Sequence, residues 1–108
     1  MVKLPALLVV LASAALAQSG NADNGKRVFM KDGCYECHGT VAQGGTGPRL
    51  TPPAIALSTL TAIVRKGVGG MPPYSAKVLS DAELTDIHAY LETIPAPPPA
   101  KSIALLNQ

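Results

Sequence analysis

The stretch Cys34-Tyr35-Glu36-Cys37-His38 constrains this 108-residue chain more than any other feature of its sequence. It has the pattern C-x-x-C-H, which is typical of covalent haem attachment: two thiols form thioethers with the haem vinyl groups, and the adjacent imidazole binds the iron. Two intervening residues place the cysteines about one helical turn apart, so that both can meet a vinyl group. We therefore predict one haem c, attached through Cys34 and Cys37, with His38 as an iron ligand.

Other uses of these residues fit the sequence less well. A thioredoxin-like pair needs a βαβ setting, and no strand-like run precedes Cys34. A structural disulfide would leave His38 unexplained. Zinc is a further alternative, since His88 would complete a set of four ligands, but zinc ligands are usually spaced more widely than the adjacent Cys37 and His38. A zinc site and a plain dithiol remain the alternatives to haem.

The N-terminus has the features of a secretory signal peptide. Lys3 supplies a positive charge, residues 4–16 are apolar, and Ala15-Leu16-Ala17 is a small-residue cleavage pattern. We predict export and cleavage after Ala17. The apolar run of 13 residues is too short to cross a bilayer comfortably, so no stable membrane insertion is expected after cleavage. An uncleaved anchor is the alternative.

Composition indicates one small domain that does not bind nucleic acid. Without Lys3 the chain has eight basic and seven acidic side chains, which lacks the basic excess of a DNA or RNA binder. One Phe, three Tyr and no Trp give limited apolar volume, so a buried haem would complete the core. We divide the chain into a signal peptide (1–17), one domain (18–95) and a proline-rich tail (96–108).

The domain is predicted to be all-α. Helices are expected from about residue 22 to 31, from about 58 to 66 and from about 81 to 94, and each has capping residues or a glycine stop. The expected N-caps are Ser19, Asn21 or Asp23 for the first helix, Ser58 or Thr59 for the second, and Ser80 with Glu83 in a capping box for the last. The tail should extend as polyproline II, and its apolar end, Ile103 to Leu106, either docks or stays disordered.

A glycine-rich loop, residues 39–50, follows the haem motif. The ring nitrogen of His38 that does not bind iron needs an acceptor, and a backbone carbonyl of this loop is the expected partner. Pro48 has a carbonyl and no N–H of its own. An ordinary loop proline is the alternative interpretation.

Met71 is the candidate for the second axial ligand. It lies in the segment 67–74, whose glycines and prolines exclude a helix, so a loop presents its thioether. Iron with one imidazole accepts such a sulfur. Met1 belongs to the signal peptide, and Met30 lies too close to Cys34 to reach the opposite haem face. His88 is the competitor for this position.

Cations near the end of the second helix are candidate partners of the haem propionates. Arg65 and Lys66 fall where the helix dipole favours positive charge. Either one can pair with a propionate or remain a solvated surface charge. We take Arg65 as the candidate.

From about residue 21 to 95 the chain resembles a small, single-haem class I cytochrome c of the bacterial periplasm. The resemblance rests on Gly25-Lys26-x-x-Phe29, Cys34-x-x-Cys37-His38-Gly39, Gly47-Pro48-x-Leu50, Gly70-Met71-Pro72 and Tyr90-Leu91, in this order. It implies three to four short helices and loops wrapped around one covalently bound haem. It also implies axial ligation by His38 and Met71, a bond from His38 to the Pro48 carbonyl, and a crossing of Gly25 and Phe29 with the helix that bears Ile87 and Tyr90.

The resemblance predicts an electron carrier rather than an enzyme. It would take electrons from a periplasmic dehydrogenase and pass them to an oxidase or another cytochrome, docking through the uncharged rim of Gly69, Gly70, Pro72 and Pro73. Arg49, Arg65, Lys66 and Lys77 would add mild attraction for an acidic partner. A second version makes the chain a fixed cytochrome subunit of a dehydrogenase, with the tail as its tether. The rival is a haem enzyme or gas-binding protein in which Met71 is labile.

Overall fold

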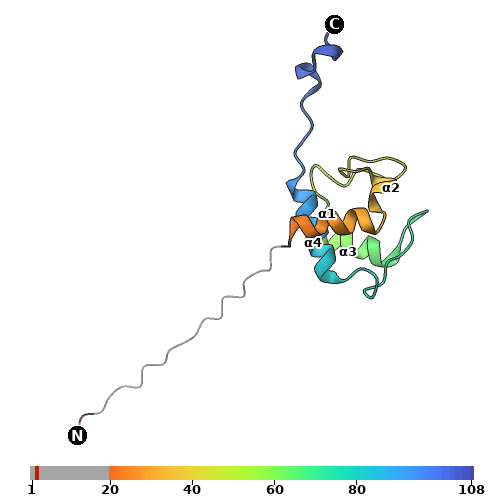
Figure 1. Cartoon of the computed structure of the whole chain (residues 1–108), viewed down its shortest axis with the longest axis vertical. Helices are drawn as coiled ribbons and strands as arrows, with labels where there is room; N and C mark the ends of the chain where they lie inside the picture. The colour runs from red at the N-terminus through yellow and green to blue at the C-terminus, as the bar shows by residue number, and fades with distance from the viewer. Residues whose placement is uncertain (1, 3–19) are drawn as a thin grey trace.

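The computed structural model describes residues 20–108, together with Val2. It contains four α-helices: α1 (Ala22–Lys31), α2 (Cys34–His38), α3 (Leu57–Lys66) and α4 (Asp81–Thr93) (Figure 1). Residues 20–108 form no strand beyond one isolated bridge between Val68 and Met71. The all-α prediction is therefore confirmed. The predicted signal peptide, residues 1–17, lies outside the described residues apart from Val2.

The N-cap was predicted correctly for two of the three expected helices. The Asn21 side chain accepts a hydrogen bond from the Asn24 N–H at 3.0 Å and caps α1. Ser80 caps α4, and its predicted capping box with Glu83 is complete. The predicted cap of α3 is wrong: Ala56 is the N-cap and makes no side-chain bond, whereas Ser58 and Thr59 lie exposed within the helix.

The start of α3 is set by packing rather than by a cap. Leu60 and Val64 are its buried residues, and the Leu60 N–H already donates to the Ala56 carbonyl at 2.9 Å. Water can satisfy the exposed first turn, so no capping hydroxyl is needed there. The predicted end is confirmed, because Gly67 follows the helix with a φ of +72° and donates to the Ile63 carbonyl.

The crossing of α1 and α4 is the main helix–helix contact. Gly25 lies against the backbone of α4, where an added Cβ would collide with the Asp86 carbonyl. One turn further, Phe29 and Tyr90 meet edge to face, with ring centroids 5.6 Å apart. The predicted crossing is confirmed. Asp86 also ties the helices together, since its carboxylate accepts from the Asn21 N–H and the Asn24 amide, both at 2.7 Å.

Side-chain hydrogen bonds hold the long loops onto this helical frame. The buried Thr51 hydroxyl donates to the Leu91 carbonyl at 2.9 Å. The Tyr90 hydroxyl donates to the Thr40 carbonyl at 3.2 Å. Both bonds anchor the segment between α2 and α3 to α4, and so fix the loop that follows the C-x-x-C-H motif.

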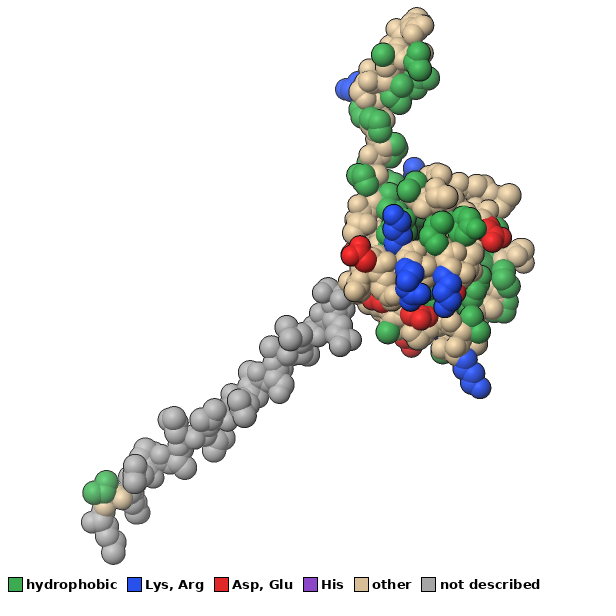
Figure 2. Space-filling view, in the orientation of Figure 1, with side chains coloured by type: hydrophobic (Ala, Val, Ile, Leu, Met, Phe, Trp, Pro, Cys, Tyr) green, Lys and Arg blue, Asp and Glu red, His purple; other side chains and the backbone are tan. Residues whose placement is uncertain are grey.

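The tail leaves the end of α4 and projects away from the helical body (Figure 1). It carries two 3₁₀-helices, η1 (Ala100–Ser102) and η2 (Ala104–Leu106), which were not predicted from the sequence. Within residues 20–108, neither packs against an α-helix. Leu105 and Leu106 are 80% and 64% exposed, and Figure 2 shows hydrophobic side chains along this segment.

Among residues 20–108 no helix is both long enough and apolar enough to cross a bilayer.

Candidate haem site

A cavity of about 420 Å³ opens between α1, α2, α3 and the loop that carries Met71. This volume falls within the range of about 300–1,000 Å³ that is usual for cofactor sites. Its walls are largely apolar and include Phe29, Leu60, Val64, Leu79, Leu84 and Ile87. Five of the predicted site residues line it: Cys34, Cys37, His38, Pro48 and Met71. The cavity therefore combines an apolar interior with thiol, imidazole and thioether groups at its wall, which is the donor set that haem c requires.

The single-turn helix α2 presents the three residues of the haem motif. Gly33 precedes it in the left-handed conformation, with a φ of +79°, which turns the chain sharply out of α1. The His38 side chain is buried, and its Nδ1 lies 2.7 Å from the carbonyl oxygen of Pro48. A carbonyl can only accept, so Nδ1 carries the proton and donates it. This leaves the lone pair of Nε2 free for a metal.

Gly47 brings the loop against the His38 ring, a role that the sequence analysis missed. A Cβ added at Gly47 would lie 2.9 Å from His38 Cε1 and 3.0 Å from Nδ1. The Gly47 N–H also donates to the Cys37 carbonyl at 2.8 Å. The signal was present in the sequence, since a glycine stands directly before Pro48, but a glycine-rich loop does not reveal which glycine needs the space.

Met71 is presented by a tight turn, as its Gly/Pro surroundings predict. The backbones of Val68 and Met71 exchange hydrogen bonds of 2.9 and 3.2 Å, and Gly67 and Gly69 have φ values of +72° and +56°. The Tyr74 N–H donates to the Val64 carbonyl at 2.8 Å, which ties the turn to α3. The half-buried Met71 side chain lines the same cavity as His38.

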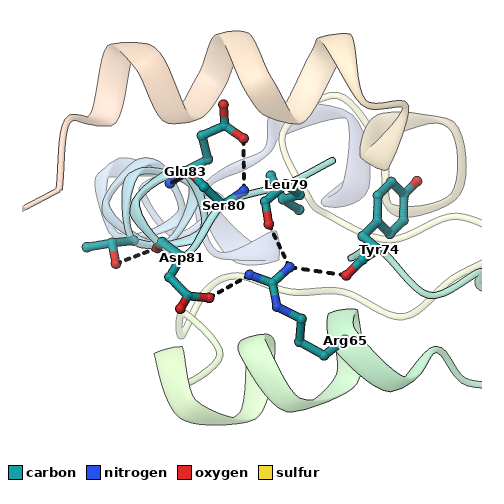
Figure 3. A network of polar contacts seen from close by, with 7 residues as sticks. Arg65, Tyr74, Leu79, Ser80, Asp81 and Glu83 are labelled. Carbon is teal, nitrogen blue, oxygen red and sulfur yellow. Dashed lines mark hydrogen bonds and ion pairs between the residues drawn. The ribbon is translucent and has the colours of Figure 1, made fainter. Parts of the chain in front are cut away.

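Arg65 does not line the cavity. Its guanidinium donates to the carbonyls of Tyr74, at 3.1 Å, and Leu79, at 2.6 Å, and pairs with Asp81 (Figure 3). These bonds connect α3 to the segment between Met71 and α4. The geometry thus gives Arg65 a structural role and no support for the predicted contact with a propionate. Arg49 does line the cavity. The sequence could have indicated this, because Arg49 directly follows Pro48, the expected partner of His38.

The Cys34 thiol lacks the lowered pKa of a redox-active cysteine. Burial raises the pKa of the Cys34 thiol to about 11, and the nearby negative charge of Asp32 adds to the shift. Dithiol oxidoreductases depend instead on a thiol whose pKa is lowered. Cys34 and Cys37 are also free of any disulfide with each other.

The zinc alternative is not supported by the geometry either. His88 does not line the cavity, and its Nδ1 lies 3.7 Å from Glu92 Oε1 on α4. Within residues 20–108 no group of three or more His, Cys, Asp or Glu side chains is arranged to hold a metal ion. Because His88 lies outside the cavity wall and Met71 lies in it, the geometry favours Met71 over His88 as the second iron ligand.

The fold and the cavity together define a small helical protein of the c-type haem class. Comparison with known proteins agrees. Residues 20–91, more than half of the chain, match the family model described as "Cytochrome C oxidase, cbb3-type, subunit III". The chain belongs to the cytochrome c family, whose members carry covalently bound haem c and transfer electrons without catalysing a reaction themselves. Members are typically exported.

Three curated relatives span most of the chain. The cytochrome c subunit of 4-cresol dehydrogenase [hydroxylating] from Pseudomonas putida is 35% identical over 96 residues, which cover 89% of this chain and 81% of that protein. A cytochrome c-553-like protein from Synechocystis sp. is 33% identical, covering 76% and 77%. Cytochrome c-555 from Methylococcus capsulatus is 31% identical, covering 84% of each. No solved structure matches the chain significantly.

Proposed function

We propose that this protein carries one electron at a time between redox proteins, with His38 and Met71 as the two axial ligands of the haem iron. The observation that carries the proposal is the pairing of His38 Nδ1 with the Pro48 carbonyl at 2.7 Å, which directs the unprotonated Nε2 to a metal. Met71 lines the same cavity. Bound haem c supplies the gain and loss of a single electron at iron.

The chain's own residues would hold the site rigid and dry. Leu60, Val64 and Leu84 surround the cavity with apolar side chains that exclude water. If His38 and Met71 both bind the iron, no coordination position would be left for a substrate, which favours electron transfer over catalysis. Arg49 is the cation at the cavity wall, and we assign it to a propionate.

The axial assignment is tested by substituting Met71 with alanine in holoprotein produced in cells that mature c-type cytochromes. The variant should keep covalent haem, lose the weak near-infrared band of a ferric haem with methionine sulfur, and bind carbon monoxide rapidly. Met30→Leu, which alters the other methionine near the core, should retain the band. If the unsubstituted protein lacks the band and binds carbon monoxide rapidly, the haem enzyme or gas-binding alternative is favoured instead.

We assign partner docking to the rim around Met71. Val68, Gly69, Gly70, Pro72 and Pro73 are exposed and uncharged, and they border the cavity-lining methionine. A small apolar surface of this kind suits the weak, short-lived complexes of electron transfer, which bury less than about 1,200 Å². Pro73→Glu, at an exposed rim residue that does not line the cavity, should slow electron transfer from the partner and leave the haem spectrum unchanged. Val78→Glu, at an exposed valine outside this rim, is the control.

A dehydrogenase is the partner that the comparisons favour. One relative is the cytochrome subunit of 4-cresol dehydrogenase, and the exposed apolar end of the tail offers a means of attachment. In this version, residues 96–108 tether the cytochrome to the dehydrogenase. Deleting the tail, or replacing Leu105 and Leu106 with serine, should abolish co-purification with the dehydrogenase and preserve the haem spectrum. A complex that survives both changes would exclude the tether.

We place this activity in the periplasm, after removal of residues 1–17. The proposal is supported by Lys3, the apolar run that follows it, and the small residues ending at Ala17. N-terminal sequencing of the haem-containing protein from a periplasmic extract should begin at Gln18. Haem-containing protein that starts at Met1 and sediments with membranes would instead indicate an uncleaved anchor.

A further inference from the structure

Asp32, which follows α1, is a buried carboxylate with an unsatisfied oxygen. Its side chain is 8% exposed, and Oδ2 has no hydrogen-bond partner. The nearest cation is Lys31, whose Nζ lies 3.7 Å from Oδ1, but that side chain is 58% exposed and so is largely screened by water. Burial of a carboxylate with an unpaired oxygen is costly, because the protein interior solvates charge poorly. The position of the Asp32 carboxylate therefore needs a physical explanation.

Asp32 adjoins the wall of the haem cavity through its backbone. The Asp32 carbonyl accepts a hydrogen bond from the Tyr74 hydroxyl at 3.0 Å, and both Tyr74 and Cys34 line the cavity. Burial raises the pKa of Cys34 and of Tyr74, and the Asp32 charge adds to the increase at each residue. Two wall residues therefore experience this negative charge, and one of them is a haem attachment site.

We propose that the Asp32 carboxylate lowers the reduction potential of the bound haem. The ferric haem core carries one more positive charge than the ferrous core, so a fixed anion nearby favours the ferric state. In a buried setting this interaction is much stronger than it would be between charges in water. Asp32 is thus a residue that tunes the potential rather than a ligand. The inference rests on the proposed electron-carrier function.

The test compares Asp32→Asn with Glu36→Gln in the holoprotein. Glu36 is two residues from Cys34, as Asp32 is, but it is exposed, so its substitution makes the same change in charge where water screens it. The midpoint potential of Asp32→Asn should shift upward, and by clearly more than that of Glu36→Gln. Equal shifts, or an unchanged potential in Asp32→Asn, would overturn the inference. The near-infrared methionine band of each variant shows that the ligands are intact.

A second pair of variants covers the case in which Asp32→Asn does not mature. Asp32→Ser also removes the charge, so the midpoint potential should rise by clearly more than in Asp81→Asn, which removes an exposed carboxylate that does not line the cavity. No rise relative to Asp81→Asn would contradict the role of Asp32. If the unsubstituted protein lacks covalent haem or the methionine band, the proposed function fails. If it has both and these shifts are absent, only the Asp32 inference fails.

Discussion

The imidazole Nδ1 of His38 and the carbonyl oxygen of Pro48 lie 2.7 Å apart, across a loop of nine residues. This bond fixes both the tautomer and the orientation of a buried ring. It depends on the loop backbone approaching the ring closely, because the acceptor is a main-chain oxygen. Gly47, directly before Pro48, permits that approach.

Gly47→Ala should therefore disturb the His38 ring. The new methyl group would lie 2.9 Å from Cε1, so either the ring or the loop must move. We expect a loss of about 1–3 kcal/mol in the free energy of unfolding, as is usual when an extra methyl is forced into a packed site. A weakened His38–Pro48 bond should also make the imidazole a poorer electron donor to iron, and so raise the midpoint potential. Denaturant unfolding and potentiometry measure both effects.

Gly70→Ala is the matched control for this prediction. No atom lies within 4 Å of a Cβ added at Gly70, which stands next to the other proposed ligand, Met71. Its stability should change by no more than about 0.5 kcal/mol, as for most exposed substitutions. An equal loss of unfolding free energy in Gly47→Ala and Gly70→Ala would show that replacing any loop glycine destabilises the protein, and that the contact with His38 is not the cause.

Local features of this fold were predictable from the sequence. Cys34, Cys37 and His38 occupy one helical turn, so their arrangement follows from spacing alone. The same holds for the Ser80–Glu83 capping box. The family resemblance added the helix that crosses at Gly25, and it favoured Pro48 as the acceptor for His38 over an ordinary loop proline. Leu84, Ile87 and Leu91 follow one another at helical spacing, and the structure buries all three on one face of α4.

Features that depend on tertiary contacts were not predictable. Arg65 was expected near a propionate because it stands at a helix end, but its bonds reach residues up to 16 positions along the chain. Nothing local marks Tyr74 and Leu79 as carbonyl acceptors for it. Asp32 looks like an ordinary polar residue after a helix, and only the fold buries it. The missed start of α3 has the same origin, because burial of Leu60 and Val64 outweighs a capping hydroxyl.

Gly25→Ala should weaken the contact between α1 and α4. Alanine favours helix over glycine by up to about 1 kcal/mol. The collision of its methyl with the Asp86 carbonyl should cost about 1–3 kcal/mol or more, because both groups belong to rigid backbone. The collision costs more than the helix propensity of alanine gains, so the melting temperature should fall. Lys26→Ala, at an exposed neighbouring position of the same helix, should leave it nearly unchanged; a rise in Gly25→Ala would contradict the crossing.

Stability should decrease in alkaline solution because of Tyr90. Burial raises the pKa of its phenol above the ordinary value of 10.0. The folded state thus holds this proton more tightly than the unfolded state. The resulting stabilisation is fully present below about pH 10 and is lost as the pH rises through the folded-state pKa, at up to about 1.4 kcal/mol per pH unit.

Tyr90→Phe should flatten this dependence. The variant loses the hydrogen bond to the Thr40 carbonyl, so it should be less stable at neutral pH by about 1 kcal/mol. Its stability should then fall less steeply above pH 10 than that of the unsubstituted protein. Circular dichroism of the helices measures both quantities without depending on the iron ligands. Parallel curves for the two proteins would exclude Tyr90 as the group responsible.

Arg65→Gln should loosen the segment that carries Met71. Arg65 holds the carbonyls of Tyr74 and Leu79, and loss of such charged hydrogen bonds costs about 1.5–3 kcal/mol each at most. Its pairing with Asp81 contributes little, about 0–1 kcal/mol, because the Asp81 side chain is 83% exposed. Asp81→Asn should therefore be nearly neutral, whereas Arg65→Gln lowers the melting temperature.

The same pair of variants separates a structural role for Arg65 from a contact with a propionate. If Arg65 acts through the backbone of residues 74–79, its loss should make the methionine band of the ferric protein disappear at lower temperature than in Asp81→Asn. The potential at low temperature, where the band is intact, should change little, because the guanidinium lies outside the cavity wall. A fall in potential with an unchanged melting temperature would instead place Arg65 on a propionate.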